Sequence, residues 1–314
     1  PTGVRAVFEA RGEIISAPAD KGDARNLTNT PNVMERDPAW STDGKWIAYF
    51  SDESGEYMLP LREQNGMGEA KKLTLGSAPG FYTNPDWSPD SKKLAYNDNH
   101  MNLWFVDIEK GTNTKVDTNP YGTLDDVLAP SWSPDGKWIA YFADATGEYE
   151  LYLHPSDGKG RPRQVTQGGA AFRYSPLWSP NSKLVAFSDK TGSLYITDVN
   201  DGKVTFVDKD EWSNMSSYTW SADSRWVYYS AQVDGAVELM RVSLDGDAQR
   251  LTHSEPGVLS YHCRVSADGR FIIYGSTRCL LSTSDASHEL LCVDSRGSRH
   301  LKKQKPTALL NRQS

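Results

Sequence analysis

The chain has 314 residues, a formal net charge of −7 and 38% hydrophobic residues, including ten tryptophans and 15 tyrosines. This content is enough to build a core, which excludes wholesale disorder, and the negative charge argues against nucleic acid, because phosphate binding needs a basic face. No apolar run reaches the roughly 18 residues that a transmembrane helix requires, so we expect no membrane span.

One motif recurs along the whole chain. It reads Trp-Ser-x-Asp-Gly/Ser-Lys/Arg followed by an apolar run, with spacings of 42 to 47 residues between copies. Five copies begin at tryptophan and a sixth has valine in that place: Trp40, Trp87, Trp132, Trp178, Trp220 and Val265. A seventh, partial copy at residues 1–10 lacks the Trp-Ser half. Such a series indicates a repeat architecture.

Each copy predicts four short strands. A proline and an Asp-Gly pair suit the tight turn after the first strand, and the second strand alternates its side chains between two faces. In the copy that contains Trp132, the expected elements are a first strand ending at 132–133, a turn at 134–136, a second strand at 138–142, a hairpin tip at 144–148, a third strand at 149–153, a turn at 156–158 and a fourth strand ending at 165–166.

Four antiparallel strands per repeat are typical of a β-propeller blade. We therefore predict an all-β fold, a seven-bladed β-propeller of four-stranded antiparallel blades over residues 1–303, with the first blade incomplete at the N-terminus. The repeated Trp and Tyr side chains would bury on the order of 150–250 Å² each. We accordingly interpret the motif as architecture rather than chemistry.

The last residues do not follow the repeat. Residues 299–314 are basic, and residues 304–314 are expected to form a tail. One hypothesis is that residues 306–311 supply the missing strand of the first blade and cover its unpaired edge. The alternative is a disordered tail.

These residues resemble a known family. The WSPDGK-(I/L)-A-(Y/F) unit and a trailing Leu/Val-Thr, found at Leu27-Thr28, Leu73-Thr74, Val165-Thr166 and Leu251-Thr252, are similar to the repeat of the Tol-system periplasmic propeller and of the two propellers of tricorn protease. The repeat resemblance covers about residues 1–300. Residues 4–57 are more specific, because they resemble the start of the second, seven-bladed propeller of the tricorn family.

The tricorn resemblance implies a domain that guides peptides to or from the catalytic chamber of a serine protease. In that family the catalytic domains and a PDZ-like module follow the propellers, and this chain stops about where they would begin. No G-x-S-x-G elbow is present, so no catalytic residue is carried over. The implied partners are a peptide or other small ligand in the central channel and the C-terminal protease domains. The resemblance implies a cytoplasmic location, with the periplasm as the alternative if a leader was removed.

We expect ligand contacts at the mouth of the central channel, just before each motif tryptophan. The connections that enter these positions are long and differ between copies, unlike the scaffold. The candidate residues are Glu35, Arg36, Asp37, Tyr82, Asp125, Asp126, Arg173, Tyr174, Tyr261 and His262. This mixture suits charge pairing and stacking with a peptide or a sugar. It also suits paired carboxylates for glycoside hydrolysis, or charges that only solvate a water-filled channel.

No metal or other cofactor is expected. The acids at the hairpin tips, Asp52, Asp144 and Asp189, do not follow the spacing of a calcium loop and are interpreted as turn residues. The histidines show no H-x-H or i,i+4 pairing. The three cysteines, Cys263, Cys279 and Cys292, are interpreted as buried or incidental thiols, with a Cys279–Cys292 bridge as the alternative.

Three functions therefore stand. The preferred one is a non-catalytic propeller that binds or passes peptides. The second is a stand-alone propeller hydrolase acting on a peptide, ester or glycoside at the channel mouth. The third is a scaffold for protein partners, as the Tol-system resemblance implies.

Overall fold

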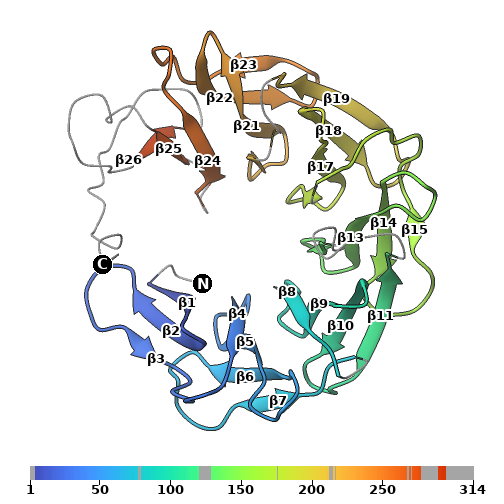
Figure 1. Ribbon diagram of the computed structural model, residues 1–314. Helices are drawn as coiled ribbons and strands as arrows, with labels where there is room; N and C mark the ends of the chain where they lie inside the picture. Colours follow the sequence, from blue (N-terminus) through green and yellow to red (C-terminus); the bar gives the residue numbers. More distant parts are fainter. Residues whose placement is uncertain are drawn as a thin grey trace. The chain divides into compact units, whose positions relative to one another are not determined.

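Figure 1 shows a computed structural model of the chain. The residues that the structure describes are 4–76, 79–119, 129–174, 176–211, 215, 217–266, 269, 271–276 and 289–294, with the backbone alone described for 261, 262 and 289–294. All regular elements within these residues are β-strands. No helix in this part of the chain is long and apolar enough to cross a membrane. The all-β class is therefore confirmed.

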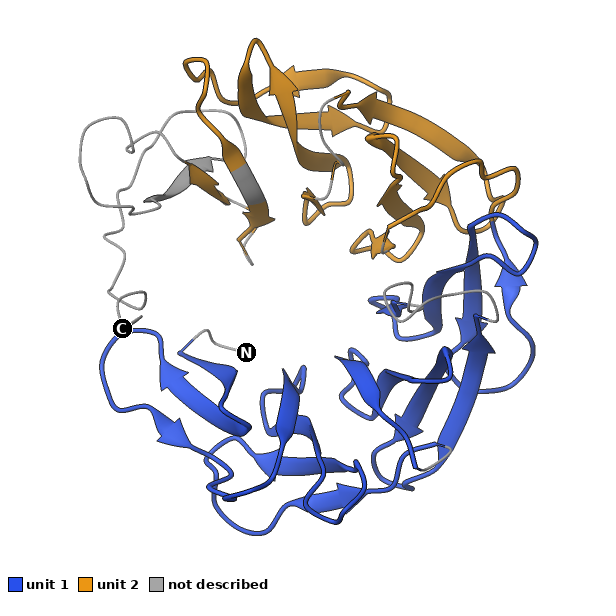
Figure 2. Ribbon diagram, viewed as in Figure 1, with its two compact units in different colours: residues 1–165 blue, residues 166–314 orange. Residues whose placement is uncertain are grey.

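The chain divides into two compact units, residues 1–165 (unit 1) and 166–314 (unit 2), which Figure 2 colours separately. The described residues of unit 1 form one three-stranded and three four-stranded sheets, each in chain order. Its strands are β1 (Arg5–Ala10), β2 (Glu13–Pro18), β3 (Arg25–Asn26); β4 (Glu35–Trp40), β5 (Trp46–Ser51), β6 (Leu59–Glu63), β7 (Lys71–Leu73); β8 (Tyr82–Trp87), β9 (Lys93–Asp98), β10 (Asn102–Asp107), β11 (Asn113–Thr118); and β12 (Ser131–Trp132), β13 (Trp138–Ala143), β14 (Glu150–Pro155), β15 (Arg163–Gln164).

Unit 2 contains two four-stranded sheets and one three-stranded sheet among the described residues. Its strands are β16 (Leu177–Trp178), β17 (Leu184–Ser188), β18 (Ser193–Asp198), β19 (Val204–Lys209); β20 (Tyr218–Trp220), β21 (Trp226–Val233), β22 (Ala236–Ser243), β23 (Ala248–Arg250); and β24 (Ser260–Val265), β25 (Phe271–Ser276), β26 (Glu289–Asp294).

The strand order follows the repeat. Neighbouring strands in every sheet pair antiparallel. The partial first copy forms a three-stranded sheet, β1–β3, as expected from its missing first strand. Within unit 1, β1, β4 and β8 lie side by side while β3, β7 and β11 lie farther apart, so consecutive sheets spread like a fan (Figure 1).

The Ser and Asp of the motif build the turn between the first two strands. The Ser133 hydroxyl donates to Asp135 Oδ1 at 2.7 Å and accepts the backbone N–H of Trp138 at 2.9 Å. Asp135 Oδ1 also accepts the N–H of Lys137 at 3.1 Å. The same hydroxyl-to-side-chain bond recurs at Ser41, Ser88, Ser179 and Ser221. The motif thus satisfies the backbone of its own turn.

The fifth position of the motif is glycine in some copies and serine in others. Gly44 and Gly136 adopt φ of 76° and 71°, and Ser91 and Ser224 adopt 58° and 60°, so serine accepts a left-handed backbone there. The Ser91 hydroxyl accepts the N–H of Asp43, in the turn of the preceding sheet, at 2.9 Å. The Ser224 hydroxyl accepts the N–H of Asn181 at 3.1 Å. These serines therefore join neighbouring sheets.

The motif tryptophans join sheets as well. In Trp87 and Trp132, the indole Nε1 donates to a backbone carbonyl of the preceding sheet. Trp87 donates to the carbonyl of Ala39 at 3.0 Å, and Trp132 donates to the carbonyl of Asp86 at 3.1 Å. Trp220 does the same in unit 2. Trp40 differs, because its indole donates to Gly44 in its own turn at 3.0 Å. These bonds support the interpretation of the motif as architecture.

The trailing Leu-Thr closes the outer edge of a sheet. The backbone N–H of Leu27 donates to the carbonyl of Ile14 at 2.8 Å, and Leu27 itself is buried. The Thr28 hydroxyl accepts the N–H of Ile14 at 3.1 Å and donates to Glu13 Oε2 at 2.7 Å. Leu251 and Thr252 repeat these contacts in unit 2, on Leu239 and Glu238.

Polar groups in the core are paired across sheets. The buried Tyr141 hydroxyl, in β13, donates to Asp117 Oδ2, in β11 of the preceding sheet, at 2.7 Å. Tyr229 and Asp208 form the same pair in unit 2 at 2.7 Å. Cys263 is also buried, as expected, and burial raises the pKa of its thiol. The other two cysteine side chains lie outside the described residues.

We expect Trp132→Phe to destabilise the protein by about 2 kcal/mol, because it removes a buried hydrogen bond to the neighbouring sheet together with part of the core. Urea unfolding followed by circular dichroism measures the change. Trp40→Phe is the matched control, since its indole hydrogen bond stays within its own turn, and it should cost about half as much. Equal losses in the two variants would refute the role given to the cross-sheet bond.

Candidate functional site

Two neighbouring strands of unit 1, β4 and β8, share an unusual backbone. Asp37 and Asn84 adopt φ of 51° and 56°, and each precedes a proline. At both places the pairing with the next strand shifts register. A bulge of this kind bends a strand and re-aims its side chains, and it is common beside binding sites.

Arg36 lies at the centre of a polar and aromatic cluster. Its Nη2 donates to the carbonyl of Tyr82 in β8 at 2.8 Å, and its Nη1 lies 3.4 Å from Asp37 Oδ2. The guanidinium carbon is 3.9 Å from the ring centre of Phe81 and 4.9 Å from that of Tyr57, and the side chain is only 12% exposed. Cation–π contacts of this kind hold the guanidinium in place.

Two carboxylates meet beside this arginine. The backbone N–H of Asp37 donates to Glu9 Oε2, on the neighbouring strand β1, at 3.1 Å. Burial raises the pKa of Asp37 and the Glu9 charge adds to that rise, although Arg36 opposes it. With Glu9, Asp37 and Arg36 together, the site carries an excess of one negative charge when both acids are ionised. It therefore favours a cationic group.

Phe81 gives the same site an exposed apolar surface. Its side chain is 44% exposed although one face covers Arg36, and its ring packs edge-on against Tyr57 with centroids 5.6 Å apart. Its backbone N–H donates to Asn99 Oδ1 at 3.1 Å, which fixes the loop before β8. Glu9, Arg36, Asp37, Tyr57 and Phe81 are named here the inner-strand site.

Two predicted residues of β4 and β8 point into the protein instead. Glu35 is 1% exposed, and its Oε1 accepts the Thr30 hydroxyl at 2.7 Å. Burial raises the pKa of Glu35. Tyr82 is fully buried, and its ring packs edge-on against Tyr96 with centroids 5.6 Å apart. Burial likewise raises the pKa of Tyr82. Only its carbonyl, which holds Arg36, serves the site.

Sequence reasoning overlooked two acids. Glu9 lies in the partial copy, outside the segments that precede a tryptophan, so no motif marks it. Asp86 directly precedes Trp87, where other copies have Ala39, Ser131 or Leu177. Burial raises the pKa of Asp86 to about 6. The residue before Trp220 is Thr219 and that before Val265 is Arg264, so an acid at this position in a single copy is a signal that could have singled Asp86 out.

The predicted residues of unit 2 are also placed by stacking. Arg173 Nη1 donates to the Thr166 hydroxyl at 2.7 Å, and its guanidinium carbon lies 5.0 Å from the ring centre of Phe187. Tyr174 packs edge-on against Phe172 with centroids 5.4 Å apart. Tyr261 and His262 belong to β24, but their side chains lie outside the description. Asp125 and Asp126 lie outside the described residues altogether.

The acids at two hairpin tips bind backbone, Asp189 in its own turn and Asp52 in another segment. Asp52 Oδ1 accepts the N–H of Met34, just before β4, at 2.7 Å. Asp189 Oδ1 accepts the N–H of Thr191 at 2.8 Å and that of Ser193 at 3.3 Å. Within the described part of the chain, no group of three or more His, Cys, Asp or Glu side chains is arranged to hold a metal ion.

Replacing Asp86 should change how stability depends on pH. Because burial raises the pKa of Asp86 from 3.8 to about 6, the folded protein loses stability as pH rises through that window. We expect Asp86→Asn to raise the free energy of unfolding at pH 7 by on the order of 2 kcal/mol, and to have little effect below pH 3.8. Urea unfolding at several pH values measures this. Asp20→Asn, at an exposed site, is the control, and a gain independent of pH would contradict the assignment.

Comparisons with known proteins show which sequences this chain resembles. The family model described as the tricorn protease second beta propeller domain matches residues 1–144. An uncharacterized protein of Agrobacterium fabrum is 28% identical over 207 residues, covering 63% of this chain and 67% of that protein. The Tol-Pal system protein TolB of Francisella tularensis subsp. mediasiatica is 27% identical over 232 residues, covering 70% of this chain and 51% of that protein. The chain thus spans about half the length of that TolB protein.

A solved structure agrees on the fold. The crystal structure of Porphyromonas gingivalis dipeptidyl peptidase 4 superposes with a TM-score of 0.68 at 15% sequence identity, covering 96% of this chain and 52% of that one. Such low identity shows a shared fold alone. The match to the tricorn propeller and the TolB relatives support a β-propeller similar to those of TolB and tricorn protease.

Proposed function

We propose that this chain is a seven-bladed, non-catalytic propeller that binds peptides at the inner-strand site, as the gating domain of a larger peptidase. The match of residues 1–144 to a propeller of tricorn protease supports a role in handling peptides. The seven sheets among the described residues are consistent with seven blades over residues 1–303. Protease domains would then be partners supplied outside this chain.

The observation that carries the proposal is the inner-strand site itself. The Glu9 and Asp37 carboxylates lie on adjacent strands. Asp37 binds Glu9 through its backbone N–H, so this bond uses neither of its own carboxylate oxygens, of which Oδ2 pairs with Arg36. Asp37 is about one third exposed, so a ligand can reach it. A peptide amino terminus or a lysine side chain supplies the cation that this charge balance favours.

The aromatic part of the site suits the remainder of a peptide. Phe81 is held by Arg36 on one face and by Tyr57 at its edge, so its exposed surface is rigid before any ligand arrives. A pre-organised aromatic ring binds apolar side chains at a small entropic cost. Arg36 is already bonded to Tyr82 and Asp37, and we therefore assign it to positioning Phe81 rather than to the ligand.

A protein-interaction scaffold is the second candidate, because TolB relatives carry the name of the Tol-Pal system. In that case the ligand is a segment of a protein partner rather than a free peptide. A stand-alone hydrolase is the third candidate, and Asp86 is the described acid on the inner strands whose raised pKa suits proton transfer near neutral pH.

The test is the binding of fluorescent hexapeptides by anisotropy. We expect peptides with a free amino terminus and an apolar residue next to it to bind about tenfold more tightly than their acetylated forms. The double variant Glu9→Gln/Asp37→Asn should abolish that preference, and higher salt should weaken it. Asparagine is tolerated at position 37 because Asn84 occupies the equivalent place with the same backbone.

Glu109→Gln is the matched control, since this acid lies in the turn between β10 and β11 and away from the inner strands. Equal binding of free and acetylated peptides by wild type would refute a carboxylate site. Mass spectrometry of the incubated peptides separates binding from turnover. Shortened products that disappear in Asp86→Asn would favour the hydrolase over the proposal.

A further inference from the structure

Two hollows open at equivalent places between consecutive sheets. In unit 1 the hollow lies between the β4–β7 and β8–β11 sheets, and in unit 2 between the β16–β19 and β20–β23 sheets. Four residues that line the first hollow have counterparts in the second. Trp46 corresponds to Leu184, Leu61 to Ile196, Lys71 to Thr205, and Ile108 to Leu244.

Strand register establishes these correspondences. Trp46 and Leu184 both follow the Lys of the motif. Leu61 pairs with Ala48 on one side and with Lys71 on the outer strand. Ile196 likewise pairs with Ala186 and, on the outer strand, with Thr205. In the following sheet, the N–H of Ile108 donates to the carbonyl of Lys92, and that of Leu244 to the carbonyl of Arg225.

The hollow of unit 1 is charged and partly occupied by its own side chains. The Lys71 ammonium donates to the carbonyl of Ile108 at 2.5 Å, so its stem crosses the gap. Lys110 pairs with Asp107 at 3.4 Å, and Lys92 completes the lining. The indole of Trp46 packs against the core beside it. Water and ions suit such a lining better than an apolar ligand.

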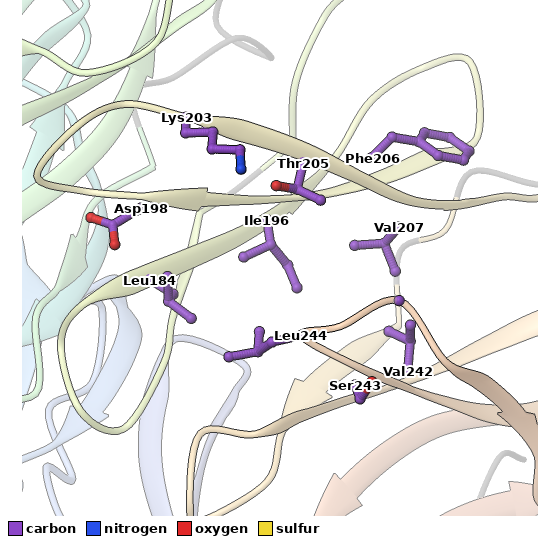
Figure 3. A pocket seen from close by; sticks show the side chains of 11 residues that line it. Leu184, Ile196, Asp198, Lys203, Thr205, Phe206, Val207, Val242, Ser243 and Leu244 are labelled. Atoms are coloured by element: carbon purple, nitrogen blue, oxygen red, sulfur yellow. The ribbon is translucent and has the colours of Figure 1, made fainter.

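The hollow of unit 2 has lost both large side chains. Leu184 stands in place of the tryptophan and Thr205 in place of the lysine. This hollow measures about 160 Å³, against about 430 Å³ in unit 1, so the two differ in the chemistry of their lining and not by space gained in unit 2. Figure 3 shows Ile196 and Val207 on one side of it and Val242 and Leu244 on the other. A cavity of roughly 150 Å³ lined by aliphatic side chains holds one benzene ring.

The rim of this pocket is exposed and apolar, with one cation. Leu244 is 46% exposed at this rim, whereas the ring of Phe206 turns to the other face of its sheet and packs edge-on against Tyr195 with centroids 5.9 Å apart. Lys203 lines the pocket and has no ion pair among the described residues. The neighbouring Asp198 Oδ1 already accepts the backbone and side-chain N–H groups of Asn200, at 2.8 and 3.0 Å. Lys203 is therefore available to an anion from outside.

We propose that this pocket, between β17–β19 and β22, is a second binding site, which takes an aromatic ring that carries a carboxylate. The ring lies among the aliphatic side chains of the pocket, and Lys203 pairs with the carboxylate. Leu244 covers the exposed edge of the ring. Two sources share this chemistry, a free aromatic acid and the C-terminal aromatic residue of a peptide. This pocket is distinct from the inner-strand site, and the test of ligand binding here does not depend on the function proposed for the inner-strand site.

The test is calorimetric titration with 3-phenylpropionate and with its neutral amide. We expect saturable binding of both at millimolar concentrations or below, with the acid several-fold tighter. The double variant Leu184→Trp/Thr205→Lys, which adds an indole and an ammonium group to the aliphatic pocket, should weaken both by about tenfold or more. Lys203→Gln should weaken only the acid, by about fivefold. Lys183→Gln, in the adjacent exposed turn, is the control and should change neither.

Folding of the variants is checked by circular dichroism and thermal unfolding. Unit 1 already accommodates Trp and Lys at these positions, so the double variant should fold, and Lys203→Gln decides the question if it does not. The proposal is overturned if neither probe binds, if the filled pocket binds like wild type, or if Lys203→Gln affects acid and amide equally. Tetrapeptides ending in phenylalanine, with a free or an amidated C-terminus, then identify the source. Tighter binding of the free form than of 3-phenylpropionate indicates a peptide, and weaker binding indicates a free acid.

Discussion

The structure depends on apolar packing between neighbouring sheets, because each sheet is apolar on both faces. In β9, Leu94 and Tyr96 pack into a cluster with the preceding sheet, while Ala95, between them, packs into a cluster with the following one. Strand alternation thus sends successive side chains to different neighbours. A sheet of this kind has no face for water, and its stability comes from the sheets on either side.

This packing leaves the inner strands free to vary. Trp87 and Ser88 must be kept, since one bonds the preceding sheet and the other builds the turn. The side chains of the residues that precede each motif tryptophan do not build the turn. In these segments the bulges at Asp37 and Asn84 interrupt the strand pairing. The rigid scaffold holds Arg36 and Phe81 in fixed positions. A binding site can therefore be assembled from irregular residues without loss of the repeat.

The repeat made the fold predictable in detail. Its period gave the strand order, and the Trp-Ser-x-Asp pattern gave the turns, which the Ser133 and Asp135 hydrogen bonds explain. The site was predictable only in outline. Arg36 and Asp37 were recognisable as charges ahead of a tryptophan. Whether an adjacent residue faces a ligand or the core depends on alternation and on the bulge, and these place Glu35 inside the protein.

The acids that were overlooked show a second limit. Glu9 approaches Asp37 only because β1 lies beside β4, a proximity that arises between repeats rather than within one. A pattern read along the chain describes each repeat but not the pairs formed across two of them. The pKa of Asp86 likewise depends on how deeply its neighbours bury it, and that depth is a property of the assembled sheets.

The choice between glycine and serine in each motif turn restricts how such a chain can evolve. Ser91 and Ser224 accept a backbone bond from the turn before them. At Gly269, by contrast, an added Cβ would lie 3.1 Å from the Ala222 methyl carbon in the preceding turn. Each turn is therefore matched to its predecessor. Duplicating or exchanging whole repeats would juxtapose mismatched turns, so the order of these near-identical segments is itself inherited information.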